Sequence, residues 1–283
     1  MFNQDNSIIP DRCFSPIDGH DLFISHYQPH ESNQNGIGIL FCDPILEEKQ
    51  DSRRALANWA NYLAQNGYNV LCFDFRGQGE STGMFSDFTP EDAFKDIEFC
   101  FRELKDKKGV ERIGFFGMRY GCNLAARAAI ELKPDFMILW GAMINGGQYA
   151  DTILRANLTT QLLVHRKVIT NRKTLVEKMR AGETVNIDGY DLSLDWYTYM
   201  TERDIAKDLR NFQGALCLLE LDPKPQRREK KWNDFTESVE LNANGNMSAI
   251  TKCDQFWKLI PRYIAWPDEP IEKTMEFLNS NAG

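Results

Sequence analysis

Short apolar runs and longer amphipathic segments alternate along most of the chain. The apolar runs predict buried strands at 38–43, 69–74, 112–116, 135–140 and 214–221. Apolar residues at helical spacing predict helices at 54–65, 122–132 and 272–278, and Thr89-Pro90 should begin another that ends near Lys108. This alternation predicts an α/β domain whose mainly parallel sheet is covered by helices.

Weaker signals lie outside this regular alternation. Residues 12–16 and 21–27 predict an opening hairpin that turns at Asp18-Gly19, and residues 238–241 predict a late strand. From Gly141 the rhythm changes, because residues 146–208 have helical or irregular patterns with little strand character. We therefore expect an inserted helical cap at 145–208 between two parts of one core, 1–144 and 209–283.

The composition narrows the class of protein. Hydrophobic residues make up 42% of the 283 residues, which is enough for a substantial core. No apolar run approaches the ~18 residues of a membrane span, and the first residues (MFNQDNSIIPDR) lack the features of a signal peptide. The 7 scattered cysteines predict buried free thiols in a reducing compartment, so we expect a cytoplasmic protein. The 4 histidines lack metal-ligand spacing, so neither a metal nor a cofactor is expected.

The charge disfavours nucleic acid as a partner. The net charge is −8, and no basic stripe dominates the sequence. One basic run, residues 224–231 (KPQRREKK), contains a proline and a glutamate. We expect a solvated loop there rather than a phosphate-binding patch.

The segment with the clearest chemistry is Gly117–Gly121 (GMRYG), between the strand at 112–116 and the helix at 122–132. In α/β-hydrolases the pattern G-x-S-x-G occupies this strand-to-helix junction. The glycines permit a tight turn, the middle residue points into the pocket, and the following N–H can help stabilise an oxyanion. Here the middle residue is Arg119, whose guanidinium stays protonated and cannot attack a carbonyl.

Further motifs carry a family resemblance: SPIDGHDLFISHYQP near the start, GYNVLCFDFRGQGES, and the strand before the elbow. With them, residues 14–140 resemble the α/β-hydrolase superfamily in its serine aminopeptidase S33 and monoacylglycerol lipase-like branch. A closer resemblance is to the hydrolase 2 proteins associated with exosortase A systems, through Glu47–Arg53 (EEKQDSR), the elbow arginine, Gly189-Tyr190 and Phe256-Trp257. The resemblance implies an α/β-hydrolase fold, with an eight-stranded, mostly parallel sheet and a helical cap.

The resemblance also places the other members of a catalytic triad. Asp222 stands where the acid would follow the seventh strand, but no histidine follows His165. The expected histidine loop offers Asp254 or Gln255, and neither can act as base and then acid as imidazole does. Where most lipase-like members have His-Gly after the third strand, this chain has Asp43-Pro44, and proline offers no N–H. Ordinary acyl-enzyme hydrolysis is therefore not expected.

Other candidate groups have structural interpretations that we favour. Ser81 belongs to a loop common in the fold, and Cys122 at a helix start is a small residue suited to packing, although helix N-termini lower thiol pKa values. The cap cluster Trp196, Tyr197, Tyr199 and Met200 could line an apolar pocket, but core packing is the commoner role. His165 is the one histidine that could approach the pocket, and we expect it at the surface.

Arg119 itself allows two interpretations, which are compatible with each other. In the structural one, Glu47, Glu48, Asp222 or Asp254 neutralises the guanidinium, because an unpaired buried charge is costly. In the functional one, Arg119 and the helix dipole bind a carboxylate, a phosphate or an acyl oxyanion. We favour the internal pair, which a ligand could complete.

The leading hypothesis is a degenerate hydrolase-family protein that binds a small acidic or acylated ligand in the old active-site pocket. The resemblance suggests polysaccharide, envelope or other biosynthesis. One alternative is an enzyme with non-serine chemistry (a lyase, an isomerase or an acyl-handling enzyme) that uses Arg119 with Glu47 or Glu48, and another is a non-catalytic scaffold for a protein partner. The candidate residues for chemistry are Arg119, Glu48 and Asp222, and those for ligand binding are Asp43, Glu47, Arg119, Tyr120 and Gln255.

Overall fold

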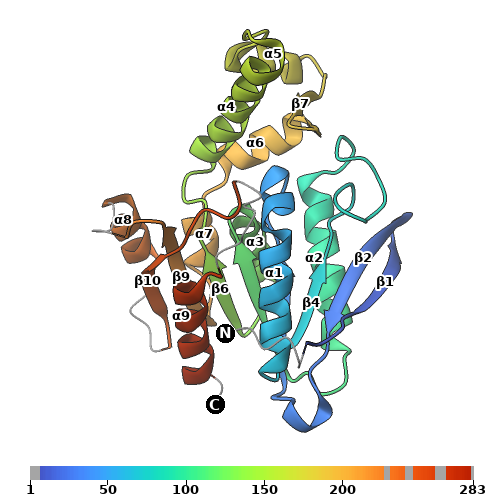
Figure 1. Ribbon diagram of the computed structural model, residues 1–283, viewed down its shortest axis with the longest axis vertical. Coiled ribbons are helices and arrows are strands. Elements are labelled where there is room, and N and C mark those ends of the chain that lie inside the picture. Colours follow the sequence, from blue (N-terminus) through green and yellow to red (C-terminus); the bar gives the residue numbers. More distant parts are fainter. Residues whose placement is uncertain (1–6, 226–229, 240–244, 259–265, 282–283) are drawn as a thin grey trace.

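The computed structural model describes residues 7–225, 230–239, 245–258 and 266–281. Its centre is an eight-stranded sheet with the order β1-β2-β4-β3-β5-β6-β9-β10, in which β2 alone runs antiparallel to the strands beside it (Figure 1). This confirms the predicted α/β fold with a mostly parallel sheet. The strands are β1 (Asp11–Ile17), β2 (His20–Tyr27), β3 (Ile37–Cys42), β4 (Asn69–Phe73), β5 (Arg112–Met118), β6 (Phe136–Trp140), β9 (Ala215–Asp222) and β10 (Met247–Lys252).

Helices cover both faces of the sheet because the central strands are apolar on both sides. Along β3, Leu40 packs into one core with residues of α2 (Pro90–Lys105) and α3 (Tyr120–Leu132). Its neighbours Ile39 and Phe41 point to the opposite face and pack with α1 (Glu47–Gln65) and α9 (Asp268–Ser280). A shorter helix, α8 (Lys230–Ser238), follows β9, and a 3-10 turn spans Glu31–Asn33.

The segment between β6 and β9 stands beyond the carboxyl ends of the strands, at the top of Figure 1. It contains α4 (Gly146–His165), α5 (Arg172–Arg180), the β7–β8 ribbon (Val185–Ile187 and Tyr190–Leu192) and α6 (Leu194–Glu202). Its last helix, α7 (Ile205–Leu209), returns to pack beside α3. We call residues 145–208 the cap.

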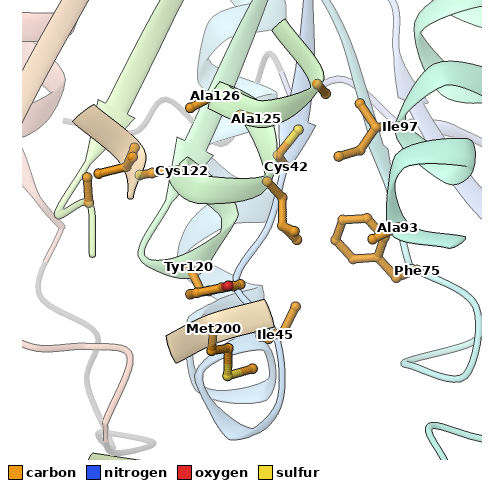
Figure 2. Packing of buried hydrophobic residues seen from close by; sticks show 14 of the residues in the cluster. Cys42, Ile45, Phe75, Ala93, Ile97, Tyr120, Cys122, Ala125, Ala126 and Met200 are labelled. Atoms are coloured by element: carbon orange, nitrogen blue, oxygen red, sulfur yellow. The ribbon is translucent and has the colours of Figure 1, made fainter. Parts of the chain in front are cut away.

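Aromatic packing fixes the cap on the core. Trp196 of α6 is fully buried, and its indole N–H donates to the carbonyl of Phe88 at 2.6 Å. The same ring packs on Phe85, Phe88 and Tyr120. Figure 2 shows Met200 of the same helix beside Tyr120. The expected core role of the cap cluster is therefore confirmed for Trp196 and Met200, which are fully buried.

Some predicted boundaries were wrong. Helix α1 begins at Glu47 rather than residue 54, so the Glu-Glu pair lies in its first turn and complements the helix dipole. Ser238 ends α8 instead of beginning a strand, since Trp232 and Phe235 bury one helical face, and residues 240 and 241 of the predicted strand lie outside the described residues. The last strand described is at Met247–Lys252. Helix α9 begins at Asp268, which places Pro270 in its first turn. The cap also contains the β7–β8 ribbon, which its pattern did not predict.

Candidate functional site

The turn between β5 and α3 places Arg119 at the carboxyl edge of the sheet. Arg119 has φ 54° and ψ −124°, a strained backbone conformation for a residue with a Cβ. Its N–H donates to the carbonyl of Trp140 at 2.9 Å. A Cβ on Gly121 would overlap the carbonyl oxygens of Cys42 and Asp43, and one on Gly117 would lie 2.8 Å from the Cα of Cys122. The predicted elbow geometry is therefore present, with arginine at its apex.

An internal carboxylate neutralises the Arg119 guanidinium. Its Nε and Nη2 donate to Oε1 of Glu48 at 3.0 and 2.9 Å, and the hydroxyl of Tyr149 donates to the other carboxylate oxygen at 3.0 Å. The guanidinium carbon lies 4.8 Å from the ring centroid of Trp257, which is a cation–π distance. The side chains of Arg119 and Glu48 are only 14% and 17% exposed. Of the partners proposed from the sequence, the structure pairs Glu48 with Arg119.

The two partners of the ion pair line different cavities. One, the elbow cavity, measures about 440 Å³ and is lined by Arg119, by the loop and helix after β6, by the end of β9 and by α8. The other, the acidic cavity, measures about 310 Å³ and is lined by Glu48, Trp257 and the acidic side chains of Glu47, Asp51 and Asp188. Tyr149 and Thr152 of α4 line both cavities.

The two cavities differ in the charge of their walls. Arg119 and Lys231 both line the elbow cavity, beside one acid, Glu220. In the acidic cavity, burial raises the pKa of Glu47, and the negative charges of Asp51 and Asp188 raise it further. One cation, Lys258, lines the acidic cavity beside its four carboxylates, so of these two cavities the elbow cavity is the more favourable for an anion.

A second strained residue leads into Glu48. Leu46, just before α1, has φ 59° and ψ −143°, and its N–H donates to Oε1 of Gln78 at 3.1 Å. Gln78 belongs to the RGQGES loop after β4. This loop therefore helps to set the start of α1, and with it the position of Glu48. Strain at both Leu46 and Arg119 marks the carboxyl edge as the constrained part of the fold.

Sequence reasoning missed two partners of the ion pair. Tyr149 lies one turn into the cap helix α4 and stacks on Tyr120 with ring centroids 5.0 Å apart. Trp257 follows β10 and is buried, with 2% exposure. Trp257 appeared in the sequence only as part of a family-like Phe-Trp pair. The signal that could have found both is an aromatic residue on each segment expected to border the pocket.

Four other residues proposed from the sequence make no hydrogen bond or ion pair with the guanidinium. Asp222 ends β9 and accepts a hydrogen bond from the N–H of Lys224 at 2.8 Å. Gln255 is exposed in the loop after β10, as is Asp254. Tyr120 is fully buried beneath the cap. Among the described residues, none of these four is recorded in a bond to Arg119, and none lines the elbow cavity.

Asp43 and Glu47 also point elsewhere. Asp43 forms an ion pair with buried Lys49, which pairs with Asp74 at 2.9 Å. Burial alone would lower the pKa of Lys49, but the two carboxylates raise it above its ordinary value. Asp43 lines a further cavity of about 400 Å³ beside β2 and α1, and exposed Glu47 lines the acidic cavity. The five candidate ligand-binding residues therefore do not form one cluster.

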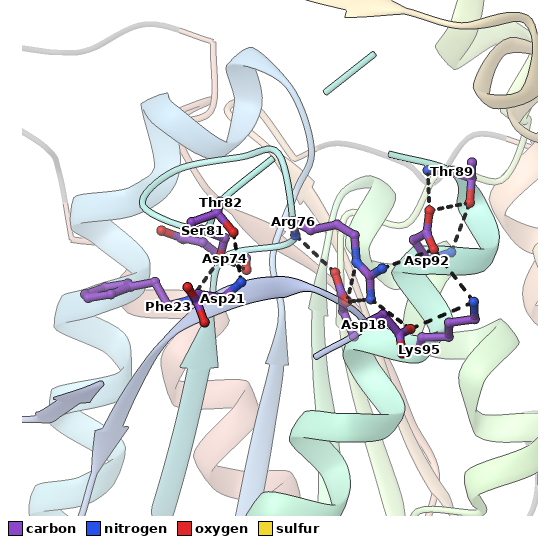
Figure 3. Close-up of polar contacts among 11 residues, drawn as sticks. Asp18, Asp21, Phe23, Asp74, Arg76, Ser81, Thr82, Thr89, Asp92 and Lys95 are labelled. Atoms are coloured by element: carbon purple, nitrogen blue, oxygen red, sulfur yellow. Dashed lines mark hydrogen bonds and ion pairs between the residues drawn. The ribbon is translucent and has the colours of Figure 1, made fainter. Parts of the chain in front are cut away.

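The alternative nucleophiles are held in structural roles. Ser81 accepts from the N–H of Phe23 at 2.8 Å and donates to the carbonyl of Asp74 at 2.5 Å, within the loop network of Figure 3. Cys122 is buried, and burial raises the pKa of its thiol well above the ordinary value, against a smaller lowering by Arg119. His165 ends α4 at the exposed tip of the cap. We find no nucleophile beside the elbow in these groups.

The structure also bears on metals, membranes and disulfides. Within the described ranges, no cluster of His, Cys, Asp and Glu side chains is placed to hold a metal ion. None of the helices described is long and apolar enough to cross a membrane. All seven cysteines are free; five are buried, Cys72 is half-buried and Cys13 is exposed. The predicted free thiols are therefore confirmed, except that these two are not buried.

The fold and the elbow define the class, an α/β-hydrolase. The family model described as serine aminopeptidase, S33, matches residues 49–210, so the chain belongs to this family. A search of curated proteins gave no match.

Solved structures share the fold at low sequence identity. The Pyrococcus furiosus esterase Pf2001 has a TM-score of 0.64 and 17% identity, over 99% of this chain and 94% of that one. Est1E from Butyrivibrio proteoclasticus, solved with ferulic acid bound, has a TM-score of 0.62 and 14% identity, over 95% and 98% of the two chains. The proline iminopeptidase of Mycobacterium smegmatis has a TM-score of 0.61 and 12% identity, over 96% and 99%. Likeness at this level extends to the fold alone.

Proposed function

We propose that this family member is a pseudoenzyme that binds a small acidic or acylated molecule in the elbow cavity. The observation that carries the proposal is the guanidinium at the elbow apex, which Glu48 and Trp257 hold in a fixed orientation while Arg119 lines the cavity. A pre-oriented guanidinium binds a carboxylate or acyl oxygen without first losing side-chain entropy. Lys231 also lines the cavity and adds positive charge.

The remaining lining suits an acyl or short hydrocarbon group. Met143, Ile144 and Leu221 supply apolar surface, while Asn145 and Gln148 supply amides that can donate hydrogen bonds. A volume of about 440 Å³ is within the range of small-molecule sites. The ligand would place its charged or carbonyl end on Arg119 and its apolar part against Met143, Ile144 and Leu221.

Binding is favoured over non-serine chemistry that would use Arg119 with Glu47 or Glu48, because of the state of these two carboxylates. A lyase or isomerase mechanism needs a free base next to the elbow cavity. Both oxygens of Glu48 accept bonds from Arg119 and Tyr149, and Glu47 lines the other cavity. Neither carboxylate is placed as a free base beside the guanidinium.

Two further observations support a cellular location and a biological role for this binding function. Seven free cysteines support a cytoplasmic location. The likeness of the EEKQDSR segment and the elbow arginine to exosortase-associated hydrolase 2 proteins favours a role in exopolysaccharide or envelope biosynthesis. We include both in the proposal.

Calorimetry with matched probes tests the ligand class. The carboxylates from acetate to octanoate are titrated beside the alcohols of the same length. We expect octanoate to bind more tightly than octanol, and Arg119→Met to weaken octanoate binding about tenfold or more, because a charge-assisted hydrogen bond contributes about 1.5–3 kcal/mol. Arg127→Met, which removes a cation that stacks on Phe94 in the core, is the matched control and should change nothing. Unchanged octanoate affinity in Arg119→Met, or no carboxylate binding at all, would refute the proposal.

A second assay tests the loss of hydrolase chemistry. A fluorophosphonate probe labels activated serines. We expect no labelling of this chain, because the hydroxyl of Ser81 both accepts and donates a hydrogen bond. Labelling of the wild type that disappears in Ser81→Ala would show a working serine and overturn the pseudoenzyme assignment.

A further inference from the structure

The outer end of the cap presents an ordered turn covered with exposed aliphatic side chains. The turn, which we call the cap tip, spans residues 162–169 and joins α4 to α5, far from the sheet in Figure 1. Leu163 is 78% exposed, Val164 66% and Ile169 55%, and Leu162 and Val168 are about half exposed. These make up five of the nine large hydrophobic side chains that are exposed among the described residues. They are therefore concentrated, not scattered over the surface.

Hydrogen bonds fix the shape of the cap tip. Oε1 of Gln161 accepts from the N–H groups of Ile169 and Thr170 at 2.7 and 2.9 Å. Its Nε2 donates to Asn157 and to Thr170 at 2.7 and 2.8 Å. Arg166 closes α4 in the left-handed region, at φ 55°. A turn held this firmly keeps its aliphatic groups in water instead of folding them inward.

Positive charge surrounds the cap tip in an otherwise acidic chain. Residues 155–180 contain seven Lys and Arg residues and one acid, Glu177, which is a net charge of +6. The whole chain has −8, which leaves −14 on the rest. All seven cations are exposed, and Arg166 and Lys167 lie within the tip itself, between the apolar groups. The tip therefore combines hydrophobic and basic groups on one protruding surface.

We propose that the cap tip docks on an anionic lipid surface. Aliphatic side chains beside Lys and Arg suit the boundary between headgroups and acyl chains, where apolar burial and charge attraction act together. A stable protein interface needs about 20–30 residues a side and is enriched in aromatic residues. The cap tip has eight residues and no aromatic one. A second copy is disfavoured because two tips of the same charge repel each other.

Docking through the tip would leave the ligand site close to the lipid surface. Helix α4 runs from the elbow cavity, where Gln148, Tyr149 and Thr152 line the wall, to the tip at His165. The tip would thus act as a peripheral contact, separate from the anion site at Arg119. Loss of lipid docking would leave octanoate binding unchanged, so the two proposals can fail independently.

Sedimentation of the full chain with vesicles tests the docking. Phosphatidylcholine vesicles with about 30% phosphatidylglycerol are compared with pure phosphatidylcholine, at about 0.1 M and about 0.5 M salt. We expect binding to the anionic vesicles at low salt, and weak binding to the neutral ones. Arg166→Glu with Lys167→Glu should reduce the partition about tenfold or more, because each basic group near an anionic surface contributes about fivefold.

Matched controls separate the tip from general effects. Arg102→Glu with Lys108→Glu makes the same charge change at two exposed cations on the core. Leu163→Asp should lower binding about tenfold, whereas Ile130→Asp, at an exposed apolar position on α3, should not. Val164→Ser is a milder second variant, and thermal unfolding confirms that each variant is folded.

Three results would overturn the docking. One is the absence of binding to anionic vesicles, and another is an equal loss in the tip and control variants. The third is a molar mass in ultracentrifugation that doubles in the wild type and returns to one chain in Leu163→Asp. That result would assign the apolar tip to contact between copies.

Discussion

Glu48→Gln is the substitution that most directly tests how the elbow is held together. Gln keeps the shape of the side chain and can still accept from Tyr149, but it removes the counter-charge of Arg119. Breaking a fully buried ion pair costs about 3–5 kcal/mol because one charge is left uncompensated. Since the two side chains keep 14% and 17% exposure, we expect about 2–3 kcal/mol here.

Urea unfolding of the wild type, Glu48→Gln, Arg119→Met and the double variant measures this loss of stability. Glu48→Gln should lower the free energy of unfolding by that amount, and the melting temperature by roughly 5–10 °C for a chain of this size. Arg119→Met alone leaves Glu48 unpaired and should also destabilise the chain. The double variant should lose less than the sum of the single losses, because neither charge is then left alone.

Glu48→Gln also links stability to the proposed ligand. If Arg119 is an anion clamp, loss of its internal partner should tighten octanoate binding, and octanoate should restore part of the lost stability. A Glu48→Gln protein with the urea midpoint of the wild type would refute the importance of the pair. Single losses that simply add in the double variant would refute the coupling.

Two further substitutions test the packing of the fold, one at the elbow and one in β2. Gly121→Ala should destabilise the chain by about 3 kcal/mol in urea unfolding, since its methyl group would overlap the carbonyl oxygens of Cys42 and Asp43 at the end of β3. Gly147→Ala is the control, because its Cβ meets only Asn145 at 3.3 Å. Equal effects of the two substitutions would contradict the steric argument. For His26, burial lowers the pKa below its ordinary value of 6.5, and Lys107 lowers it further. The unfolded chain therefore takes up a proton at a higher pH than the folded chain does, so stability should fall as the pH drops below the unfolded value of about 6.5. The fall should be smaller in His26→Gln, and identical pH profiles would disprove this origin.

Local patterns in the sequence determined the scaffold and the elbow. The apolar runs at 38–43, 112–116 and 135–140 are short and continuous because these central strands are covered on both faces. The two glycines around Arg119 are required by close backbone contact, so the sequence alone marked the turn. The sequence also showed that serine and histidine are missing from the positions that a triad would use.

Two element boundaries, the end of α8 and the start of α1, depended on tertiary packing. Residues 238–241 alternate like a strand, but Trp232, Phe235 and Val239 bury one face of α8 and its end. The sequence pattern also gave no signal for the start of α1, because no side chain caps this helix. Leu46 precedes the helix in a strained conformation that is held by Gln78, more than thirty residues away. Neither contact can be predicted from the local sequence pattern.

The partner of Arg119 was likewise a tertiary decision. Four acids were compatible with neutralising it, and sequence distance could not rank them. Glu48 is the partner because β3 and β5 lie side by side, so the first turn of α1 stands beside the elbow. Tyr149 reaches the same carboxylate from the cap, and Trp257 reaches the guanidinium from the last loop. The sequence by itself determined that an arginine stands at the middle of the tight turn, and only the folded chain decided which groups surround its guanidinium, because they come from segments that meet only when the sheet and the cap are assembled.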